Sequence, residues 1–374
     1  MAKSTKVRLG VIGMGLMGRG HARQITDGKV PGCELAAVCD EDAGVEGLFP
    51  GIPFFGSHKE LLASSTVDAV LVSTPHYAHT TVGIDALKAG LHVLVEKPIS
   101  VHKADALSLV AAHRNKKKVF AAMFNQRTDP YYRKIRQLVR GGELGRVQRI
   151  NWIITDWFRT DAYYASGGWR ATWSGEGGGV LLNQCPHNLD LWQWIFGMPA
   201  KVRGFCQFGR HHAIEVEDEV TAYFEYKDGS TGVFITSTGE APGTNRLEVA
   251  GDRGRLVVEG NRLQFRRNEM AASEFCRTSP EKFAAPPVWD VSIPMPPDHG
   301  EQHLGILRNF TNAILHGEEL LAPAAEGMHS VELANAILFS ALEDRTVSLP
   351  MPAAPYAAVL EKLKKRSRPA RRRS

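Results

Sequence analysis

The fold is decided by residues 7–18, which read Val-Arg-Leu-Gly-Val-Ile-Gly-Met-Gly-Leu-Met-Gly. The first six form an apolar, β-branched strand, and the Gly-x-Gly-x-x-Gly pattern follows it directly and leads into a helical sequence. In this pattern Gly13 permits a tight turn, Gly15 lets the backbone approach a pyrophosphate, and Gly18 lets the helix pack closely on the strand. The N–H groups at the helix start then face the phosphates, so the sequence predicts a dinucleotide-binding loop.

An acidic residue after the next predicted strand indicates which dinucleotide binds. Asp40 follows the run 35–39, about where a carboxylate reaches the adenosine ribose hydroxyls, and Glu41 and Asp42 come next. No arginine stands close to it in the sequence to accept a 2′-phosphate. The alternative is that Asp40 only caps the following turn. We expect NAD in preference to NADP, bound by Gly13, Met14, Gly15, Leu16, Met17, Gly18 and Asp40.

Strands and helices alternate through the first third of the chain. Apolar runs predict strands at 7–12, 34–39, 69–72, 91–95 and 119–122, and helical spacing lies between them at 58–64, 80–89 and 101–115. Strands that are apolar almost throughout are expected where helices cover both faces of a parallel sheet. We therefore predict an α/β Rossmann domain with a doubly wound parallel sheet over residues 1–124.

After residue 124 the pattern changes to longer, alternating segments. Strands are predicted at 147–158, 202–208, 220–226, 231–237, 247–250, 255–258 and 263–267. Helices are predicted at 130–139, 188–196, 304–316 and 326–342, and the proline-rich stretch 285–297 is typical of a surface crossing. We expect residues 125–350 to form an α+β domain with an open, mainly antiparallel sheet, which binds the substrate and forms the oligomer.

The composition is that of a globular protein. Of the 374 residues 43% are hydrophobic and 23% charged, and no apolar run approaches the roughly 20 residues of a membrane-spanning helix. The polar start at 1–6 lacks the features of a secretory signal, so we expect a cytoplasmic protein with neither a membrane nor a nucleic acid as partner. The five cysteines, at irregular spacing, indicate free thiols and no metal site.

Positive charge is concentrated at the C-terminus. Residues 361–374 carry eight Lys or Arg and one Glu, which exceeds the net charge of +5 of the whole chain, so the residues before them are mildly acidic. Such a composition is typical of a solvated tail, and we predict a basic, disordered tail over 351–374. Binding of an anion by this tail is the alternative.

A lysine stands after the fourth predicted strand. The run 91–95 leads into Glu96-Lys97-Pro98, which places Lys97 at the carboxyl end of a parallel strand, where ligands of such sheets bind. Desolvation there lowers the pKa of a lysine, so that Lys97 can exchange a proton with a substrate hydroxyl. Pro98 fixes the backbone, and its peptide bond is a candidate for the cis form. The alternative is a surface lysine beside a turn.

A glycine-rich segment supplies a second candidate. Residues 177–179 are all glycine and precede an apolar run that ends at Asn183-Gln184-Cys185-Pro186-His187. Pro186 suits the first turn of a helix, so His187 and Asp190 would share one helical face. His187 is then a candidate acid, base or hydrogen-bonding group for the substrate, and a purely structural histidine is the alternative.

Together these motifs resemble those of the Gfo/Idh/MocA family, which includes glucose-fructose oxidoreductase and inositol dehydrogenases. The resemblance covers nearly the whole chain and extends to a loop that in the family passes the nicotinamide side of the cofactor. That loop is Ser73-Thr74-Pro75 with His76 and His79. Asn125 and Arg127, just after the last Rossmann strand, are further candidates at the domain junction. The cofactor residues expected beyond the phosphate loop and Asp40 are therefore Ser73, Thr74, Pro75, His76, His79, Glu96, Lys97 and Asn125.

The resemblance also implies roles for the reacting groups. Lys97 and His187 would flank the substrate hydroxyl, and one of them would take its proton while hydride moves to the nicotinamide. Glu96 would touch the nicotinamide ribose or order its loop. Many family members carry Asp four residues before the histidine, where this chain has Asn183. An amide cannot relay a proton, so Asn183 is expected to hydrogen-bond the substrate or cofactor.

Aromatic residues gather in the second half of the chain. Six of the seven tryptophans lie between 152 and 194, interleaved with tyrosines and arginines. Aromatic faces beside planar hydrogen-bond donors suit the faces of a sugar ring. We therefore expect a substrate site made of Lys97, Arg159, Trp169, Arg170, Trp173, Asn183 and His187.

These features predict an NAD(H)-dependent oxidoreductase. Its substrate would be a sugar, a sugar derivative or a cyclitol, oxidised or reduced at a ring carbinol or carbonyl carbon. One alternative is a glycoside hydrolase that recycles bound NAD, and another is a catalytically silent, cofactor-binding regulator. The open sheet predicts a homodimer or a homotetramer.

Overall fold

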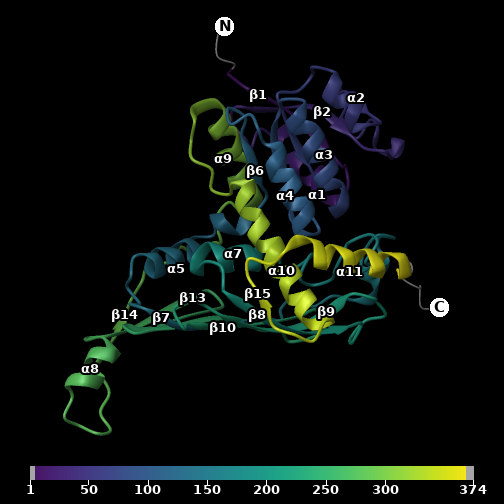
Figure 1. Cartoon of the computed structure of the whole chain (residues 1–374). Coiled ribbons are helices and arrows are strands. Elements are labelled where there is room, and N and C mark those ends of the chain that lie inside the picture. The colour runs from purple at the N-terminus through teal and green to yellow at the C-terminus, as the bar shows by residue number, and fades with distance from the viewer. Residues whose placement is uncertain (1–4, 368–374) are drawn as a thin grey trace.

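A computed structural model describes residues 5–367, which form two sheets with their own helices (Figure 1). The six-stranded sheet has the order β3-β2-β1-β4-β5-β6, and all its pairs are parallel. Its strands are β1 (Val7–Ile12), β2 (Cys33–Cys39), β3 (Phe54–Phe55), β4 (Ala69–Val72), β5 (His92–Val95) and β6 (Phe120–Ala122). Its helices are α1 (Leu16–Thr26), η1 (Ala43–Val45), α2 (His58–Ala63), α3 (His76–Lys88) and α4 (Lys103–Ala112). This strand order confirms the predicted Rossmann domain.

The core of this domain extends past the predicted boundary at residue 124. The strands are apolar on both faces and buried, as β4 and β5 show, because helices cover the sheet on both sides. The boundary does separate the two sheets, but α9 (Gln302–His316) returns to the first core through Ile306, Leu307 and Phe310. The Rossmann body is therefore completed by a helix from far along the chain.

The nine-stranded sheet has the order β14-β13-β12-β11-β7-β10-β9-β8-β15. Its strands are β7 (Val147–Ile154), β8 (Lys201–Phe208), β9 (Glu217–Glu225), β10 (Thr231–Ser237), β11 (Asn245–Gly251), β12 (Gly254–Glu259), β13 (Arg262–Asn268), β14 (Val288–Val291) and β15 (Val347–Ser348). All pairs are antiparallel except β7 with β10, which confirms an open, mainly antiparallel sheet.

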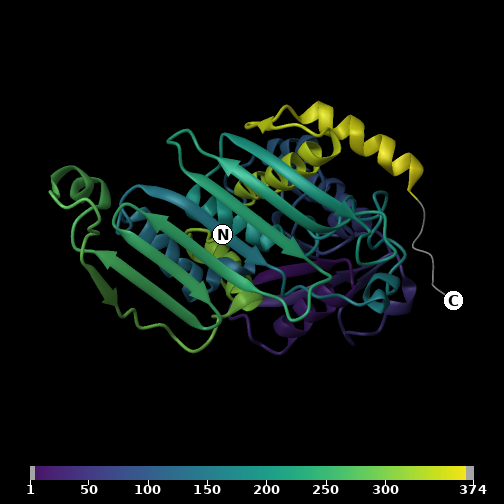
Figure 2. The same ribbon diagram turned by 90° about the horizontal axis from the view of Figure 1, so that it is seen from below.

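Helices cover only one face of this sheet. They are η2 (Asn125–Thr128), α5 (Pro130–Arg140), α6 (Asp161–Ala165), α7 (Pro186–Phe196) and α10 (Gly327–Leu342), whereas η3 (Ala324–Glu326) packs against β6 of the Rossmann sheet. The sheet and these helices share a core that includes Trp152, Trp192 and Phe234. Figure 2 shows the other face, across which no helix of the described residues passes.

The predicted disordered tail is wrong for residues 353–366. They form α11 (Ala353–Arg366), and Tyr356 and Leu360 from this helix are buried in the second core. The reason is that apolar residues four apart bury one face of α11, while its many charges lie on the solvated face. Residues 368–374, the rest of the predicted tail, lie outside the described part of the chain.

The proline-rich stretch 285–297 also differs from its prediction. It contains β14, which pairs with β13 and extends the edge of the sheet. Between these strands α8 (Ala272–Thr278) projects away from the body of the protein (Figure 1). In the described residues no helix is both long and apolar enough to cross a membrane.

Candidate active site

The phosphate loop connects β1 to α1. Gly13 has a φ of +93°, and a Cβ there would lie 2.6 Å from the carbonyl carbon of Ser73. A Cβ on Gly18 would lie 1.8 Å from the Gly13 carbonyl oxygen, whereas one on Gly15 would meet no atom within 4 Å. The loop itself therefore requires glycine at 13 and 18. The open space at Gly15, beside the start of α1, fits a pyrophosphate.

The other residues of this loop differ in exposure. Met14 is buried in the Rossmann core, whereas Leu16 and Met17 are exposed. Arg19 follows on α1, and its Nε donates to the Met14 carbonyl oxygen at 2.6 Å. Leu16 and Met17 can therefore serve a dinucleotide mainly through their backbone N–H groups at the helix start.

Asp40 lies beside the phosphate loop. Its Oδ2 accepts a hydrogen bond from the Met14 N–H at 2.5 Å, and its Oδ1 accepts one from the Asp42 N–H at 2.9 Å. The carboxylate thus caps its own turn and also ties that turn to the loop. Arg19 bonds to the carbonyl oxygen of the same Met14, so the phosphate loop is flanked by one carboxylate and one guanidinium.

The loop after β4 lies against the phosphate loop. Ser73 Oγ donates to the Gly13 carbonyl oxygen at 2.7 Å, and the Thr74 hydroxyl oxygen is buried without a partner. Pro75 precedes α3, which begins at His76, four residues before the predicted helix start. The free Thr74 hydroxyl is a polar atom that a cofactor could engage.

His79 contacts the backbone of this loop. Its two ring nitrogens lie 2.7 Å from the carbonyl oxygens of Thr74 and Pro98. It therefore connects the loop after β4 to the loop after β5, and neither of its nitrogens is left for a cofactor.

Lys97 lies at the carboxyl edge of the Rossmann sheet and reaches across to the second domain. Its Nζ donates to the carbonyl oxygen of Asn183 at 2.8 Å. Burial lowers the pKa of Lys97 below its usual 10.5, and the charge of Arg170 adds to this, while Glu96 and Glu176 oppose it. The Lys97–Pro98 peptide bond is cis. Lys97 is thus a partly buried ammonium group at the junction of the two domains.

Glu96 belongs to a buried cluster beside Lys97. Its Oε1 lies 2.8 Å from His21 Nε2, and its Oε2 accepts from the Lys97 N–H at 3.1 Å. Burial raises the pKa of Glu96, but the contact with His21 and the charges of Lys97 and His303 outweigh this and bring it to about 2. Glu96 therefore orders the loop that carries Lys97. His21 and His303 were not found from the sequence because they come from α1 and α9.

His187 is the second residue of α7, as the proline before it predicts. Its ring is buried, and Nδ1 has no hydrogen-bond partner. Burial lowers the pKa of His187 well below 6.5, and the charge of Lys97 adds to this. The start of a helix also disfavours a cation. His187 is thus a neutral imidazole close to the Lys97 ammonium.

Asp190 takes no part in this arrangement. Its oxygens accept from Arg127 Nε at 2.7 Å and from Arg127 Nη2 at 2.6 Å. Arg127 Nη1 also lies 2.5 Å from Glu326 and donates to the Leu321 carbonyl oxygen at 3.1 Å. Asp190 lies three residues after His187 on α7, as expected, but its carboxylate forms a buried ion pair with Arg127 that anchors α7 to the segment around η3.

Asn183 is held by a carboxylate that the sequence did not reveal. Its Nδ2 donates to Glu176 Oε1, and its Oδ1 accepts from the Tyr163 hydroxyl at 3.3 Å. Glu176 is buried, and its Oε2 accepts from the Ala171 N–H at 2.7 Å. Burial raises the pKa of Glu176, against these bonds and the charges of Arg170 and Lys97. The only sequence feature that could have pointed to Glu176 is its position between Gly175 and Gly177.

Aromatic side chains and arginines form the other wall. The Arg170 guanidinium carbon lies 4.7 Å from the ring centroids of both Trp169 and Tyr163, and Nη1 donates to the Tyr163 hydroxyl at 3.0 Å. Trp169 packs edge-on against His76, with centroids 5.4 Å apart. Arg159 lies 5.1 Å from the Tyr163 ring. The structure therefore brings Arg159, Trp169 and Arg170 together near Asn183.

Trp173 lies elsewhere. It is buried in the second core and packs on Phe208 at a centroid distance of 5.9 Å. Its backbone carbonyl oxygen accepts from the Tyr77 hydroxyl at 2.8 Å. The ring of Trp173 is therefore taken up by core packing and does not join the wall formed by Trp169 and Arg170.

Two further expected cofactor residues lie at the edge of the Rossmann sheet. Asn125 follows β6, donates from Nδ2 to Gln302 at 2.7 Å, and keeps a buried Oδ1 without a partner. His76 at the start of α3 is buried, and its Nδ1 lies 3.2 Å from the Glu176 carbonyl oxygen. The free oxygens of Asn125 and Thr74, like the space at Gly15, fit a bound dinucleotide.

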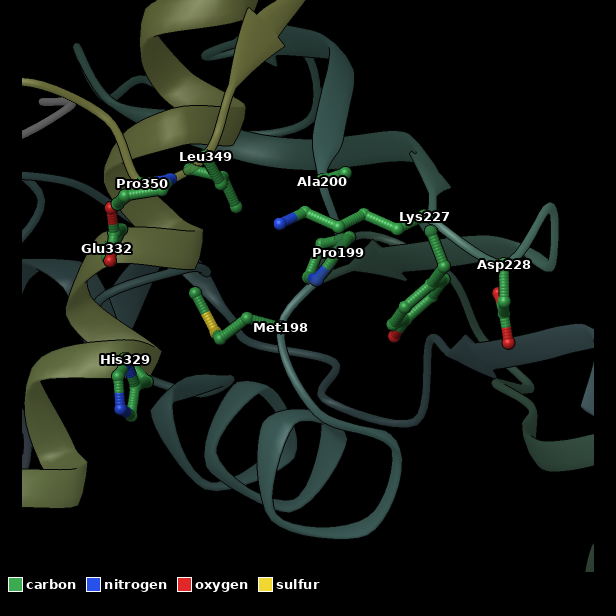
Figure 3. Close-up of a pocket in the computed structure, with 10 residues that line it drawn as sticks. Met198, Pro199, Ala200, Lys227, Asp228, His329, Glu332, Leu349 and Pro350 are labelled. Carbon is green, nitrogen blue, oxygen red and sulfur yellow. The ribbon is translucent and has the colours of Figure 1, made fainter.

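A hollow of about 500 Å³ lies beside α10 and is separate from this site (Figure 3). It is lined by Met198, Pro199, Ala200, Tyr226, Lys227, Asp228, His329, Glu332, Leu349 and Pro350. Glu332 there is already paired with Lys103 at 2.6 Å and accepts from the Met351 N–H at 2.7 Å.

Among residues 5–367 we find no group of His, Cys, Asp and Glu side chains that could hold a metal ion.

Both halves of the chain match family models. Residues 7–124 match the oxidoreductase family with an NAD-binding Rossmann fold, and residues 132–257 match the GFO/IDH/MocA C-terminal domain. An inositol 2-dehydrogenase of Leifsonia xyli is 26% identical over 277 residues, which are 67% of this chain and 78% of that protein.

Solved structures agree with this assignment. The WlbA dehydrogenase of Chromobacterium violaceum, in complex with NADH and UDP-GlcNAcA, is 26% identical, with a TM-score of 0.79 over 93% of this chain and 97% of that one. A levoglucosan dehydrogenase in complex with NADH is 19% identical, with a TM-score of 0.77 over 93% and 100%. The second of these supports the fold alone.

Proposed function

Because this chain belongs to the GFO/IDH/MocA family of NAD-binding oxidoreductases, we propose that it is a dehydrogenase or reductase of a sugar, a sugar derivative or a cyclitol. The observation that carries the proposal is the pair of Lys97 and His187, one a partly buried ammonium and the other a neutral imidazole with a free nitrogen. They lie at the carboxyl edge of the sheet that also carries the phosphate loop, where ligands of doubly wound sheets bind.

The two groups suit different parts of the proton transfer. His187 is neutral at physiological pH, so it can accept the proton of a substrate hydroxyl. Lys97 is held by the Asn183 carbonyl oxygen and can donate a hydrogen bond to the same substrate oxygen. A bound nicotinamide supplies the hydride acceptor for oxidation and the hydride donor for reduction. We assign His187 as the base and Lys97 as the group that stabilises the oxygen.

Asn183 and Glu176 position the lysine. The Asn183 backbone binds the ammonium and its side chain binds Glu176, so the buried carboxylate acts on Lys97 through the asparagine and through its own charge. Glu176 is therefore a positioning residue in this proposal. It supplies a carboxylate near Lys97, where many family members have an Asp at the position of Asn183.

The test is incubation of the protein with NAD⁺ and a panel of free sugars, glycosides and cyclitols, with NADH absorbance and product mass followed together. A dehydrogenase produces NADH in proportion to oxidised product. Glycoside cleavage without net NADH would instead identify the hydrolase alternative. Binding of NADH with no conversion of any kind would support the silent regulator.

We also propose that NAD is preferred to NADP. Asp40, Glu41 and Asp42 form an acidic turn at the phosphate loop that would repel a 2′-phosphate, whereas Arg19 is the nearby cation that could attract one. Competing titrations of NAD⁺ and NADP⁺ should give tighter NAD⁺ binding. Tighter NADP⁺ binding that is lost in Arg19→Ala would show that the arginine outweighs the acidic turn.

A homodimer or homotetramer remains part of the proposal. On the face of the nine-stranded sheet that no helix covers, Phe205 of β8 and Tyr223 of β9 are 54% and 39% exposed. Apolar side chains on an uncovered sheet face are typical of a surface that packs against another subunit. Light scattering after size exclusion should give two or four times the chain mass of 41.1 kDa, and a monomer at micromolar concentration would contradict it.

A further inference from the structure

Two arginines of the wall facing Asn183 have most of their hydrogen-bonding capacity free. Arg170 makes one side-chain hydrogen bond, to the Tyr163 hydroxyl, and Arg159 makes one, to the neighbouring Phe158 carbonyl oxygen at 2.9 Å. A guanidinium has five N–H groups, so four remain on each. Within residues 5–367 neither arginine forms an ion pair with a carboxylate.

Aromatic rings hold both guanidinium groups in place. Arg170 lies between Trp169 and Tyr163, and Arg159 lies 5.5 Å from Trp157 and 5.1 Å from Tyr163. Contact with a ring face fixes the plane of a guanidinium and leaves its edge available for hydrogen bonds. The two arginines share Tyr163 and are therefore ordered in advance, which lowers the entropy lost when they bind a ligand.

The carboxylates around Lys97 are engaged by groups other than the two arginines. The carboxylates that act on Lys97 are Glu96, which is already in contact with His21, and Glu176, which is bonded to Asn183. Burial keeps the pKa values of His76 and His187 low, so neither histidine adds charge at neutral pH. The carboxylate of Asp156 also acts on Arg159, but it forms no ion pair with that arginine, so the guanidinium edges of Arg159 and Arg170 stay available to an anion.

We propose that Arg170 and Arg159 bind an anionic group, a carboxylate or a phosphate, carried by the substrate. This inference rests on the proposed function, because the bound molecule is the one whose hydroxyl faces Lys97 and His187. A planar guanidinium edge matches two oxygens of a carboxylate or phosphate in a bidentate contact. A neutral sugar would leave both guanidinium groups unpaired. The substrate class is therefore an acidic sugar or cyclitol.

The first test measures binding to the NADH-loaded protein by calorimetry. The probes are D-glucuronate, glucose 6-phosphate and, as their neutral counterpart, glucose. At least one anionic probe should bind about tenfold or more tightly than glucose, as expected for charge-assisted bidentate contacts. Preference for glucuronate would identify a carboxylate as the bound group, and preference for the ester would identify a phosphate.

The variants then assign the effect to the arginines. Arg170→Gln should remove most of the preference and Arg170→Lys part of it, because lysine keeps the charge and loses the planar fork. Arg266→Gln is the matched control, since Arg266 is exposed on β13 and paired with Asp290. NADH affinity and thermal unfolding of each variant report whether it is folded.

Equal binding of the three probes to the wild type would overturn the inference, and so would an anion preference that persists in Arg170→Gln combined with Arg159→Gln. Turnover separates this from the proposed function. Oxidation of a neutral sugar or cyclitol as efficiently as its acidic counterpart leaves the dehydrogenase proposal standing and removes the anion site. If anionic probes bind preferentially but no substrate is oxidised, the anion site stands and the dehydrogenase proposal is contradicted.

Discussion

The phosphate loop at residues 13–18 and the loop at residues 161–187 both lie beside the carboxyl edge of the Rossmann sheet, but they are held by different means. In the first, the backbone fixes the conformation of the loop, because Gly13 has a positive φ and Gly18 leaves no room for a Cβ. In the second, Gly175, Gly177 and Gly179 also leave no room for a Cβ, but the wall itself is set by side-chain bonds, of Asn183 to Glu176 and of Arg170 to Tyr163.

This difference matches the ligands proposed for the two loops. A pyrophosphate is the same in every dinucleotide, so a loop of backbone N–H groups can bind it with little dependence on side chains. A substrate varies from one enzyme to another, and a wall of side chains can be altered by substitution without refolding the loop. The variants that follow separate these two kinds of dependence.

The largest effect is expected for Lys97→Ala, which removes a reacting side chain and leaves the phosphate loop intact. Turnover should fall by about 10²- to 10³-fold, the range for loss of one donor that stabilises a developing oxyanion, while the NADH dissociation constant changes little. Single-turnover kinetics and NADH fluorescence measure the two separately. Lys88→Ala, at the end of α3, is the control. Unchanged turnover in a folded protein would remove Lys97 from the mechanism.

Arg127→Ala should cause the largest loss of stability. It would leave the Asp190 carboxylate buried without its partner, and breaking a buried ion pair on one side costs about 3–5 kcal/mol. Equilibrium unfolding in urea measures the change. Arg133→Ala on neighbouring α5 is the control. A loss below about 1 kcal/mol would mean that Asp190 is protonated or finds other partners when Arg127 is absent.

The phosphate loop offers a matched pair of substitutions. Gly18→Ala places a Cβ 1.8 Å from the Gly13 carbonyl oxygen, so the loop must shift, at a cost of about 1–3 kcal/mol in stability and with weaker NADH binding. Gly15→Ala meets no atom in the ligand-free protein and should leave stability nearly unchanged while it weakens NADH binding. Thermal unfolding with and without NADH compares them. Equal loss of stability in both would contradict the assignment of Gly15 to the ligand.

The sequence predicted the first of these regions well, because its determinants are local. Glycines at 13, 15 and 18 directly follow an apolar strand, and Lys97 directly follows another, so strand ends alone place them. His187 was found in the same way, from the proline that starts α7. The parallel order of the six strands follows from the alternation of strands and helices.

Several residues of the second region were predicted, but their contacts were not, because these contacts join residues that no periodic pattern connects. Glu176 approaches Lys97 only when the 161–187 loop folds, and His303 reaches Glu96 only because α9 returns to the first core. Trp173 and Asp190 look like site residues in the sequence, yet core packing and Arg127 occupy them. The helix α11 was not predicted, because the many charged residues in this segment made it resemble a disordered tail.

The smallest effect tests the side-chain wall most directly. Glu176→Gln keeps the shape of the side chain and removes its charge, so the contact with Asn183 weakens and turnover at neutral pH should fall about fivefold, the difference between a charged and a neutral acceptor. NADH binding should be unaffected, since the phosphate loop is untouched.

The pH profile of the same variant identifies how Glu176 acts. Burial already lowers the pKa of Lys97, so activity that needs the ammonium should decline at a pH below 10.5. Glu176 raises the pKa of Lys97, and its loss must move that decline to still lower pH. A purely structural role for Glu176 would lower turnover at every pH and leave the position of the decline unchanged. A shift to higher pH would show that the carboxylate does not stabilise the charged lysine, and that the wall holds Lys97 through the Asn183 backbone alone.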